Sequence, residues 1–232
     1  MAELVKDEDV RIAQLLDAEA KAKELFDAVQ ERGILAPGVR ETEASDAIRD
    51  LAGELFGVRR FWHKRIVRSG ENTLEPYRHN PPDRVIAADD IAFVDFGPIF
   101  EEWEADFGRT YVLGDDPVKQ RLRDDLPAVF DAGHRYFDEH PDITGAQLYA
   151  RMRQLAEEAG WEFGGPHSGH LVGQFPHETI AGDKIESYIA PGSDRPMRRR
   201  DRTGQLCHWI LEVHLVDRAR KIGGFYEQLL DL

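Results

Sequence analysis

Four carboxylates lie inside or at the ends of apolar runs that otherwise predict buried β-strands. They are Asp95, Asp106, Glu212 and Glu227. A charged side chain in such a run is costly unless it has a partner that balances its charge. The chain must therefore fold so that these four carboxylates reach partners in the interior of a sheet.

Asp95 and Asp106 are close enough in sequence to meet in the folded chain. The segment between them, residues 96–105, is long enough to turn the chain back. The two strands can then lie side by side and bring both carboxylates to one place. Further along, Pro166–Gly173 contains His167 and His170 among glycines, which let backbones approach closely.

Four carboxylates and an imidazole that converge would repel one another, and their pKa values would shift until charge was lost. A pair of divalent cations removes this conflict. Oxygen ligands with one nitrogen suit Mn, Fe(II), Co or Zn. Two such ions about 3.5–4 Å apart can activate water and polarise a scissile carbonyl. The pattern therefore favours a dinuclear metal site.

Periodic apolar residues predict helices over residues 12–29, 42–55 and 117–137, and a fourth helix after Thr144. Thr42 is the expected cap of the second helix. Asp116 with Pro117 begins the third helix, which Pro127 is expected to kink or split. Thr144 and Gln147 form a capping box for the fourth helix.

Short apolar runs predict strands at 91–96, 107–113, 208–216 and 225–230, whereas residues 59–84 are expected to form loops and turns. Helices and strands do not alternate strictly, which favours an α+β fold over a doubly wound sheet. Neither a repeat nor a linker divides the sequence. We therefore expect a single domain over residues 1–232.

Composition excludes several classes of partner. The 232 residues carry 44 acidic and 30 basic side chains, for a net charge of −14, which disfavours binding to nucleic acid or anionic membranes. A single cysteine, Cys207, excludes a disulfide framework. No apolar run is long enough for a membrane span, and the charged N-terminus does not resemble a secretory signal. The expected location is the cytoplasm.

Four segments together resemble the pita-bread metallopeptidases, the family of methionine aminopeptidase, aminopeptidase P, prolidase and creatinase. Val94–Gly97 and Ala105–Thr110 resemble its double-aspartate motif, with a step of eleven residues between the aspartates. Gly169–Gly173, followed by His177–Glu178, is similar to its GHxxG…HE segment, and Pro37–Glu43 to its early loop. The resemblance covers nearly the whole chain. It implies a curved, mostly antiparallel sheet covered by helices.

The resemblance implies a role for each site residue. Asp95 would bind a first metal ion, Asp106 and Glu227 would bridge both ions, and His170 and Glu212 would bind the second. Glu212 would also take a proton from the attacking water. His177 would not be a ligand, because its counterpart in the family hydrogen-bonds the substrate or the tetrahedral intermediate.

Two departures from the family concern the substrate. Tyr77 stands where the family usually has a histidine, and His79, two residues on, is the candidate replacement. We therefore assign both residues to substrate binding. Phe225 stands where proline-specific members carry an arginine. The resemblance thus implies the metal site and leaves a preference for proline open.

The predicted function is hydrolysis of a peptide or other amide bond with two divalent ions, Mn first, with Co, Fe or Zn as alternatives. The resemblance favours an aminopeptidase or dipeptidase acting on a small peptide, the Xaa-Pro type included, and a homodimer is compatible with it. Two alternatives stay open. One is a family member that binds without cleaving. The other is a hydrolase of non-peptide amides or amidines, although creatinase itself lacks the metal ligands retained here.

Overall fold

One antiparallel sheet organises the part of the chain that the computed structural model describes, residues 4–175 and 185–232. Its strands follow the order β1-β2-β5-β9-β8-β6, and β7 also pairs with β8. The bounds are β1 Ile66–Ser69, β2 Ile91–Phe96, β5 Phe107–Val112, β6 Glu162–Phe163, β7 Gly169–Val172, β8 His208–Asp217 and β9 Ile222–Leu229. A separate two-stranded ribbon joins β3 (Ile99–Phe100) to β4 (Trp103–Glu104).

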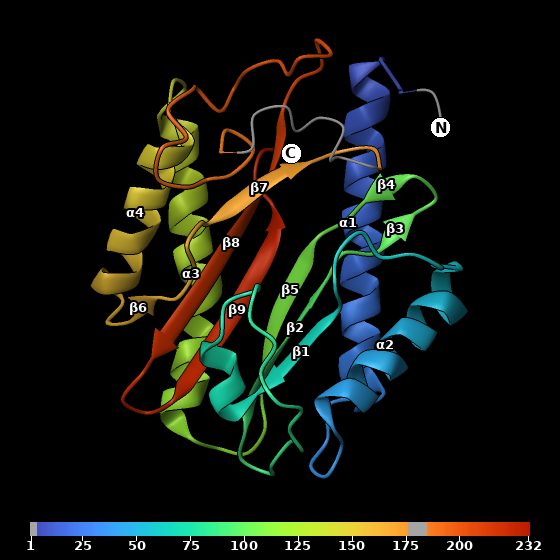
Figure 1. Ribbon diagram of the computed structural model, residues 1–232, viewed down its shortest axis with the longest axis vertical. Coiled ribbons are helices and arrows are strands. Elements are labelled where there is room, and N and C mark those ends of the chain that lie inside the picture. Colours follow the sequence, from blue (N-terminus) through green and yellow to red (C-terminus); the bar gives the residue numbers. More distant parts are fainter. Residues whose placement is uncertain (1–3, 176–184) are drawn as a thin grey trace.

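Two pairs of helices accompany this sheet. They are α1 (Glu8–Glu31), α2 (Glu41–Phe56), α3 (Pro117–Glu139) and α4 (Gly145–Glu158). Figure 1 shows α1 with α2 beside the β1–β2–β5 part of the sheet, and α3 with α4 beside the β9–β8 part. A short 3-10 helix, η1 (Gly70–Leu74), follows β1. The arrangement confirms the predicted α+β class.

Two hydrophobic cores hold the helix pairs to the sheet. The first joins α3 and α4 to β8 and includes Phe130, Met152 and Leu211. The second joins α1 and α2 to β2 and β5 and includes Leu25 and Phe107. Helix α3 is continuous across Pro127, so Pro127 does not split it, and the kink stays a prediction.

The helix caps follow the sequence prediction at α3 and α4. Asp116 accepts the backbone N–H groups of two residues in the first turn of α3, and Thr144 with Gln147 forms the expected capping box. The cap predicted for α2 is wrong, because the N-cap of this helix is Arg40, two residues before Thr42. Asp83, from a distant loop, accepts the backbone N–H of Thr42 and thereby satisfies the helix end.

The segment predicted as loop contains β1 and η1. Only the first two residues of β1 are apolar, and its last residue, Ser69, is polar but fully buried. Glu41 from α2 accepts hydrogen bonds from the backbone N–H and the hydroxyl of Ser69. A contact with a distant helix therefore stabilises this strand, and local sequence does not reveal it. Within the described residues, no helix combines the length and apolar character required to cross a bilayer.

Candidate metal centre

The register of the sheet places three of the four predicted carboxylates in one row. Asp95 lies opposite Gly108, Gly108 opposite Glu227, and Glu227 opposite Glu212. Residues in one cross-strand row point to the same face of a sheet. The side chains of these three residues therefore emerge on one face from β2, β9 and β8.

The remaining predicted ligands join this face from the neighbouring row. Asp106 precedes Gly108 by two residues, and His170 lies opposite Ile210, which precedes Glu212 by two. Side chains two residues apart on a strand point to the same side. All five predicted ligands consequently meet on one face of the sheet.

Gly108 makes room for this meeting at the centre of the row. A Cβ atom at this position would lie 2.5 Å from the ring of Phe225 and 3.1 Å from Cβ of Glu227. A contact of 2.5 Å is closer than real Cβ atoms come to other atoms. The absence of a side chain at Gly108 is what leaves room for Phe225 and Glu227 against this strand.

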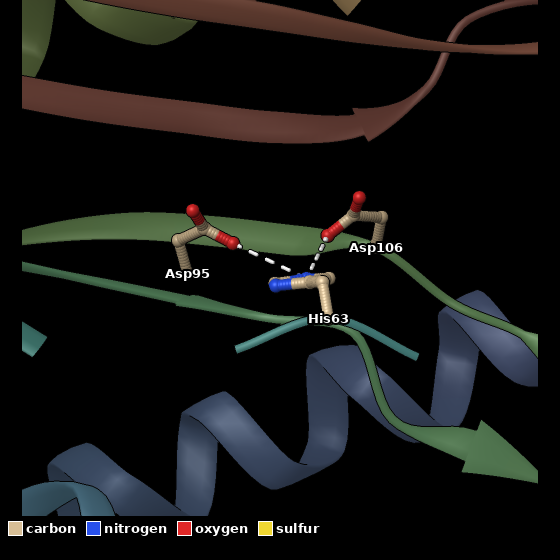
Figure 2. A group of neighbouring side chains, drawn as sticks. All are labelled: His63, Asp95 and Asp106. Carbon is tan, nitrogen blue, oxygen red and sulfur yellow. Dashed lines mark hydrogen bonds and ion pairs between the residues drawn. The ribbon is translucent and has the colours of Figure 1, made fainter. Parts of the chain in front are cut away.

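Asp106 lies between two imidazole rings. Its Oδ1 atom is 3.0 Å from Nε2 of His63, and its Oδ2 atom is 3.0 Å from Nε2 of His170. Nε2 of His63 also lies 3.5 Å from Oδ1 of Asp95. Figure 2 shows the His63 ring facing both aspartates. Glu212 and Glu227 approach Nε2 of His170 to 3.7 and 4.0 Å. The centre thus joins four carboxylates to the imidazoles of His63 and His170, and His63 was not among the predicted ligands. The ring of His167 lies beside them, with Nδ1 3.4 Å from Oε1 of Glu212.

The two imidazoles are held as cations by this surplus of carboxylates. Burial lowers the pKa of His63, but Asp106 and Asp95 outweigh it and raise that pKa to about 9. Burial likewise opposes protonation of His170, whereas the hydrogen bond and charge of Asp106 raise its pKa to about 9. The two rings in turn hold the pKa of Asp106 below its ordinary value despite burial.

Asp95 and Glu227 are held in their neutral form more readily. Burial raises the pKa of Asp95 to about 7, opposed by His63 and reinforced by Asp106. Burial, followed by the charges of Asp106 and Glu212, raises the pKa of Glu227 well above its usual range. The Oε2 atom of Glu227 is buried and has no hydrogen-bond partner among the described residues. An orphaned carboxylate oxygen beside further acids is the environment that a bound cation relieves.

The donor atoms meet the requirements of metal binding. One group is formed by His63, Asp95 and Asp106, and a second by Asp106, His170 and Glu227, each with its ligand atoms within 4.8 Å of one another. Carboxylate oxygens with imidazole nitrogen suit Mn, Fe, Co or Zn. Asp106 belongs to both groups, as expected for a carboxylate between two ions.

A cavity of about 880 Å³ opens over this centre. Part of its wall is aromatic and apolar and includes Trp62, Ile66, Tyr77, Phe93, Tyr188 and Phe225, and another part is charged or polar and includes Arg68, Arg78 and His214. The ligand residues Asp95, Asp106, His170, Glu212 and Glu227 also line it. Polar groups that converge in one large apolar pocket are typical of a small-molecule site.

The residues predicted to contact substrate differ in position. Tyr77 lines the cavity, and its ring centroid lies 5.7 Å from that of His63. His79 is not among the described residues that line the cavity; its side chain is 61% exposed and pairs with Glu75 at 2.5 Å. Spacing alone could not show that the chain turns His79 outward. His177 lies outside the described residues.

Sequence reasoning missed His63. This histidine lies in a mixed segment before β1 that has neither helical nor alternating apolar periodicity. The only local signal was a histidine beside a tryptophan in a region read as loop. Its place in the centre follows from contacts with residues more than 40 positions away.

Several proteins of known sequence or structure resemble this chain. A Xaa-Pro dipeptidase from Pyrococcus furiosus is 27% identical over 158 residues, which are 67% of this chain and 43% of that relative. A prolidase from Thermococcus sibiricus superposes with a TM-score of 0.75 at 21% identity, covering 98% of this chain and 58% of the other. An X-Pro aminopeptidase from Thermotoga maritima gives 0.75 at 20% identity, with coverages of 97% and 58%.

These likenesses confirm the predicted pita-bread fold, with its mostly antiparallel sheet and flanking helices. The chain spans less than half the length of the curated relative and under two thirds of the two solved chains. The sequence model of Metallopeptidase family M24 matches residues 13–203, most of the chain, and the protein therefore belongs to this family of metallopeptidases.

Proposed function

We propose that this chain is a dinuclear metal-dependent exopeptidase that removes the first residue of short peptides with a free N-terminus. The observation that carries the proposal is the convergence of Asp95, Asp106 and Glu227 in two donor groups that share Asp106, beside a cavity. Glu212 adds a fourth carboxylate 3.7 Å from His170. Clustered buried acids destabilise a fold unless something balances their charge, and Oε2 of Glu227 has no hydrogen-bond partner among the described residues. Clustered groups with perturbed pKa values in a cavity are characteristic of catalytic sites.

We assign the ligands as follows. Asp95 binds the first ion, Asp106 and Glu227 contact both, and His170 with Glu212 binds the second. When bound, two divalent ions would polarise the peptide carbonyl and make a water molecule more acidic. Mn²⁺ is the proposed ion, with Co²⁺, Fe²⁺ and Zn²⁺ compatible with the same donors.

The remaining chemistry falls to side chains around the ligands. Glu212, whose Oε1 atom lies 3.7 Å from Nε2 of His170, takes the proton of the attacking water. We assign His177, on its sequence motif, to hydrogen bonding with the oxygen of the scissile carbonyl. Tyr77, on the cavity wall, orients the substrate.

The cavity supports a substrate of few residues. A volume of about 880 Å³ accommodates a dipeptide or tripeptide, and its aromatic wall favours apolar side chains. The names of the relatives, a Xaa-Pro dipeptidase and an X-Pro aminopeptidase, support exopeptidase chemistry. Phe225 lines the cavity where the sequence resemblance expected an arginine in proline-specific enzymes. We therefore propose a preference for apolar first residues, without a requirement for proline.

The test is a peptide screen on protein stripped with a chelator and reloaded with Mn²⁺ or Co²⁺. Unblocked dipeptides and tripeptides, with and without proline in second place, are compared with their N-acetylated counterparts. We expect turnover of unblocked peptides only, restored by metal and abolished by the chelator. Intact metal binding without turnover of any peptide or amide would identify a binding module, and turnover of non-peptide amides alone would identify another hydrolase.

A variant links the screen to the assigned ligands. Asp106→Asn should lose most bound metal and nearly all turnover, because Asp106 is assigned to both ions. Asp115→Asn is the matched control. Asp115 is an exposed loop residue that follows β5, the strand that Asp106 directly precedes. Full metal content in Asp106→Asn would show that the ligand assignment is wrong.

A further inference from the structure

His63 and His170 occupy mirrored positions about Asp106. Each presents Nε2 to a different oxygen of that carboxylate, at 3.0 Å in both cases. Both rings are buried, with side chains 5% and 11% exposed. The sequence resemblance assigns one of these histidines, His170, to metal binding and assigns nothing to His63.

The two rings are also oriented in the same way. Nδ1–H of His63 donates to the backbone carbonyl of Lys64 at 2.7 Å, and Nδ1–H of His170 donates to that of Leu171 at 2.8 Å. Metal-binding histidines almost always donate their second ring N–H to a carbonyl or carboxylate, which fixes the ring and leaves the other nitrogen for the metal. His63 therefore has the orientation of a ligand.

The segment that carries His63 is fixed to the carboxylate strands. The backbone N–H of Trp62 donates to the carbonyl of Gly97, and its indole N–H donates to the carbonyl of Ala105, next to Asp106. A Cβ atom at Gly97 would lie 2.3 Å from the His63 ring. The His63 ring therefore packs directly against the backbone of Gly97, and this contact fixes its position.

We propose that His63 is an additional ligand of the first metal ion, together with Asp95 and Asp106. The inference rests on the proposed function, because it needs the dinuclear site. Nε2 of His63 lies 3.5 Å from Asp95 and 3.0 Å from Asp106, so one cation can contact all three donors. Each ion then has one imidazole and an oxygen of Asp106. The added nitrogen makes the first position favour Mn, Fe, Co or Zn over Mg.

The experiment measures metal binding directly. Wild type, His63→Ala and His63→Gln are stripped and titrated with Co²⁺, followed by calorimetry and visible absorption, and metal content is measured by mass spectrometry. His134→Ala is the control, because His134 is a partly exposed histidine on α3 that pairs with Asp138. Circular dichroism of the metal-free variants establishes that each one folds.

We expect the His63 variants to bind one ion with wild-type affinity and the other about 10–100-fold more weakly. Loss of a residue that merely orients a metal ligand already has an effect of this size. Proton NMR of the Co²⁺ protein gives an independent readout. Wild type should show two paramagnetically shifted, exchangeable imidazole N–H signals, and both His63 variants should show one.

Two ions bound with unchanged affinity in the His63 variants would overturn the inference, even if turnover fell, since His63 would then act on the substrate. A single shifted N–H signal in wild type with two bound ions would also overturn it. Failure of wild type to bind any metal would instead overturn the proposed function. The failures of the two proposals are therefore distinguishable.

Discussion

Glu212 on β8 and Glu227 on β9 are direct cross-strand partners at the centre of the sheet. Like charges in this relationship destabilise a sheet. Asp95 lies in the same row and Asp106 in the next, which adds to the repulsion. The fold tolerates this arrangement through neutral carboxyl groups and protonated imidazoles, and a bound cation would replace those protons.

Metal binding should therefore stabilise the fold. At a free concentration of 100 times the dissociation constant, a ligand that binds only the native state contributes about 2.7 kcal/mol. For a chain of this length we expect Mn²⁺ to raise Tm by about 5–10 °C over chelated protein, measured by calorimetry. The rise should be smaller in Glu227→Gln. Equal Tm values with and without saturating metal would mean that no cation binds the native centre.

His177 should affect chemistry and leave the metals in place. Loss of a hydrogen-bond donor to the transition state typically lowers kcat by about 10²–10³. We expect His177→Ala to keep wild-type metal content and Tm while kcat falls by about this factor and KM changes less. Steady-state kinetics and metal analysis on the same preparation provide the check. Loss of an ion would make His177 a ligand, and unchanged rates would transfer its role to Tyr77.

Gly108 should not tolerate a methyl group. In Gly108→Ala the new Cβ would meet the Phe225 ring at 2.5 Å, and overpacking of this kind costs about 1–3 kcal/mol. Because Phe225 precedes Glu227 by two residues, metal affinity should fall as well. Gly53→Ala is the control: Gly53 is an exposed helical position where the nearest atom is 3.5 Å away, so it should be neutral or stabilising. Denaturant unfolding gives the free energy of unfolding of each variant. Equal values would show that a methyl group fits at Gly108 without steric overlap.

A separate charge cluster at His208 should make stability depend on pH. Nδ1 and Nε2 of this buried ring pair with Asp231 at 3.1 Å and Glu8 at 2.7 Å. Burial lowers the pKa of His208, but the hydrogen bond and charge of Asp231 and the hydrogen bond of Glu8 outweigh it and raise the pKa above its ordinary value. The stabilisation is therefore fully present below the unfolded pKa of about 6.5 and is lost as pH rises through the folded pKa.

The measurement is urea unfolding of chelated wild type and His208→Gln between about pH 6 and 9. The stability difference between them should be largest at the acid end and should shrink as pH rises. Taking the difference cancels the titration of His63 and His170, which both proteins share. A difference that is independent of pH would show that His208 is neutral in the folded protein.

Local sequence was sufficient where local interactions decide the structure. Asp116 and Thr144 cap their helices through residues two or three positions away, and both predictions are confirmed. The short segment between Asp95 and Asp106 likewise leaves room only for a turn that brings the chain back beside the first strand. The order of these motifs was enough to identify the family and its fold.

Features that depend on distant contacts were not predictable in this way. Asp83 replaces the expected cap at Thr42 from 41 residues away, and Glu41 stabilises β1 across 28 residues. His63 reaches Asp106 because Trp62 is anchored beside it. None of these partners is marked by periodicity or spacing, so only the folded chain reveals them.

The most direct measurement is anomalous X-ray diffraction from crystals of the protein loaded with Mn²⁺. Two anomalous peaks are expected, one against each carboxylate oxygen of Asp106. One peak should lie within reach of Asp95 and the other within reach of His170 and Glu212. A single peak, or peaks that leave Asp106 without an ion, would contradict a dinuclear centre built around this carboxylate.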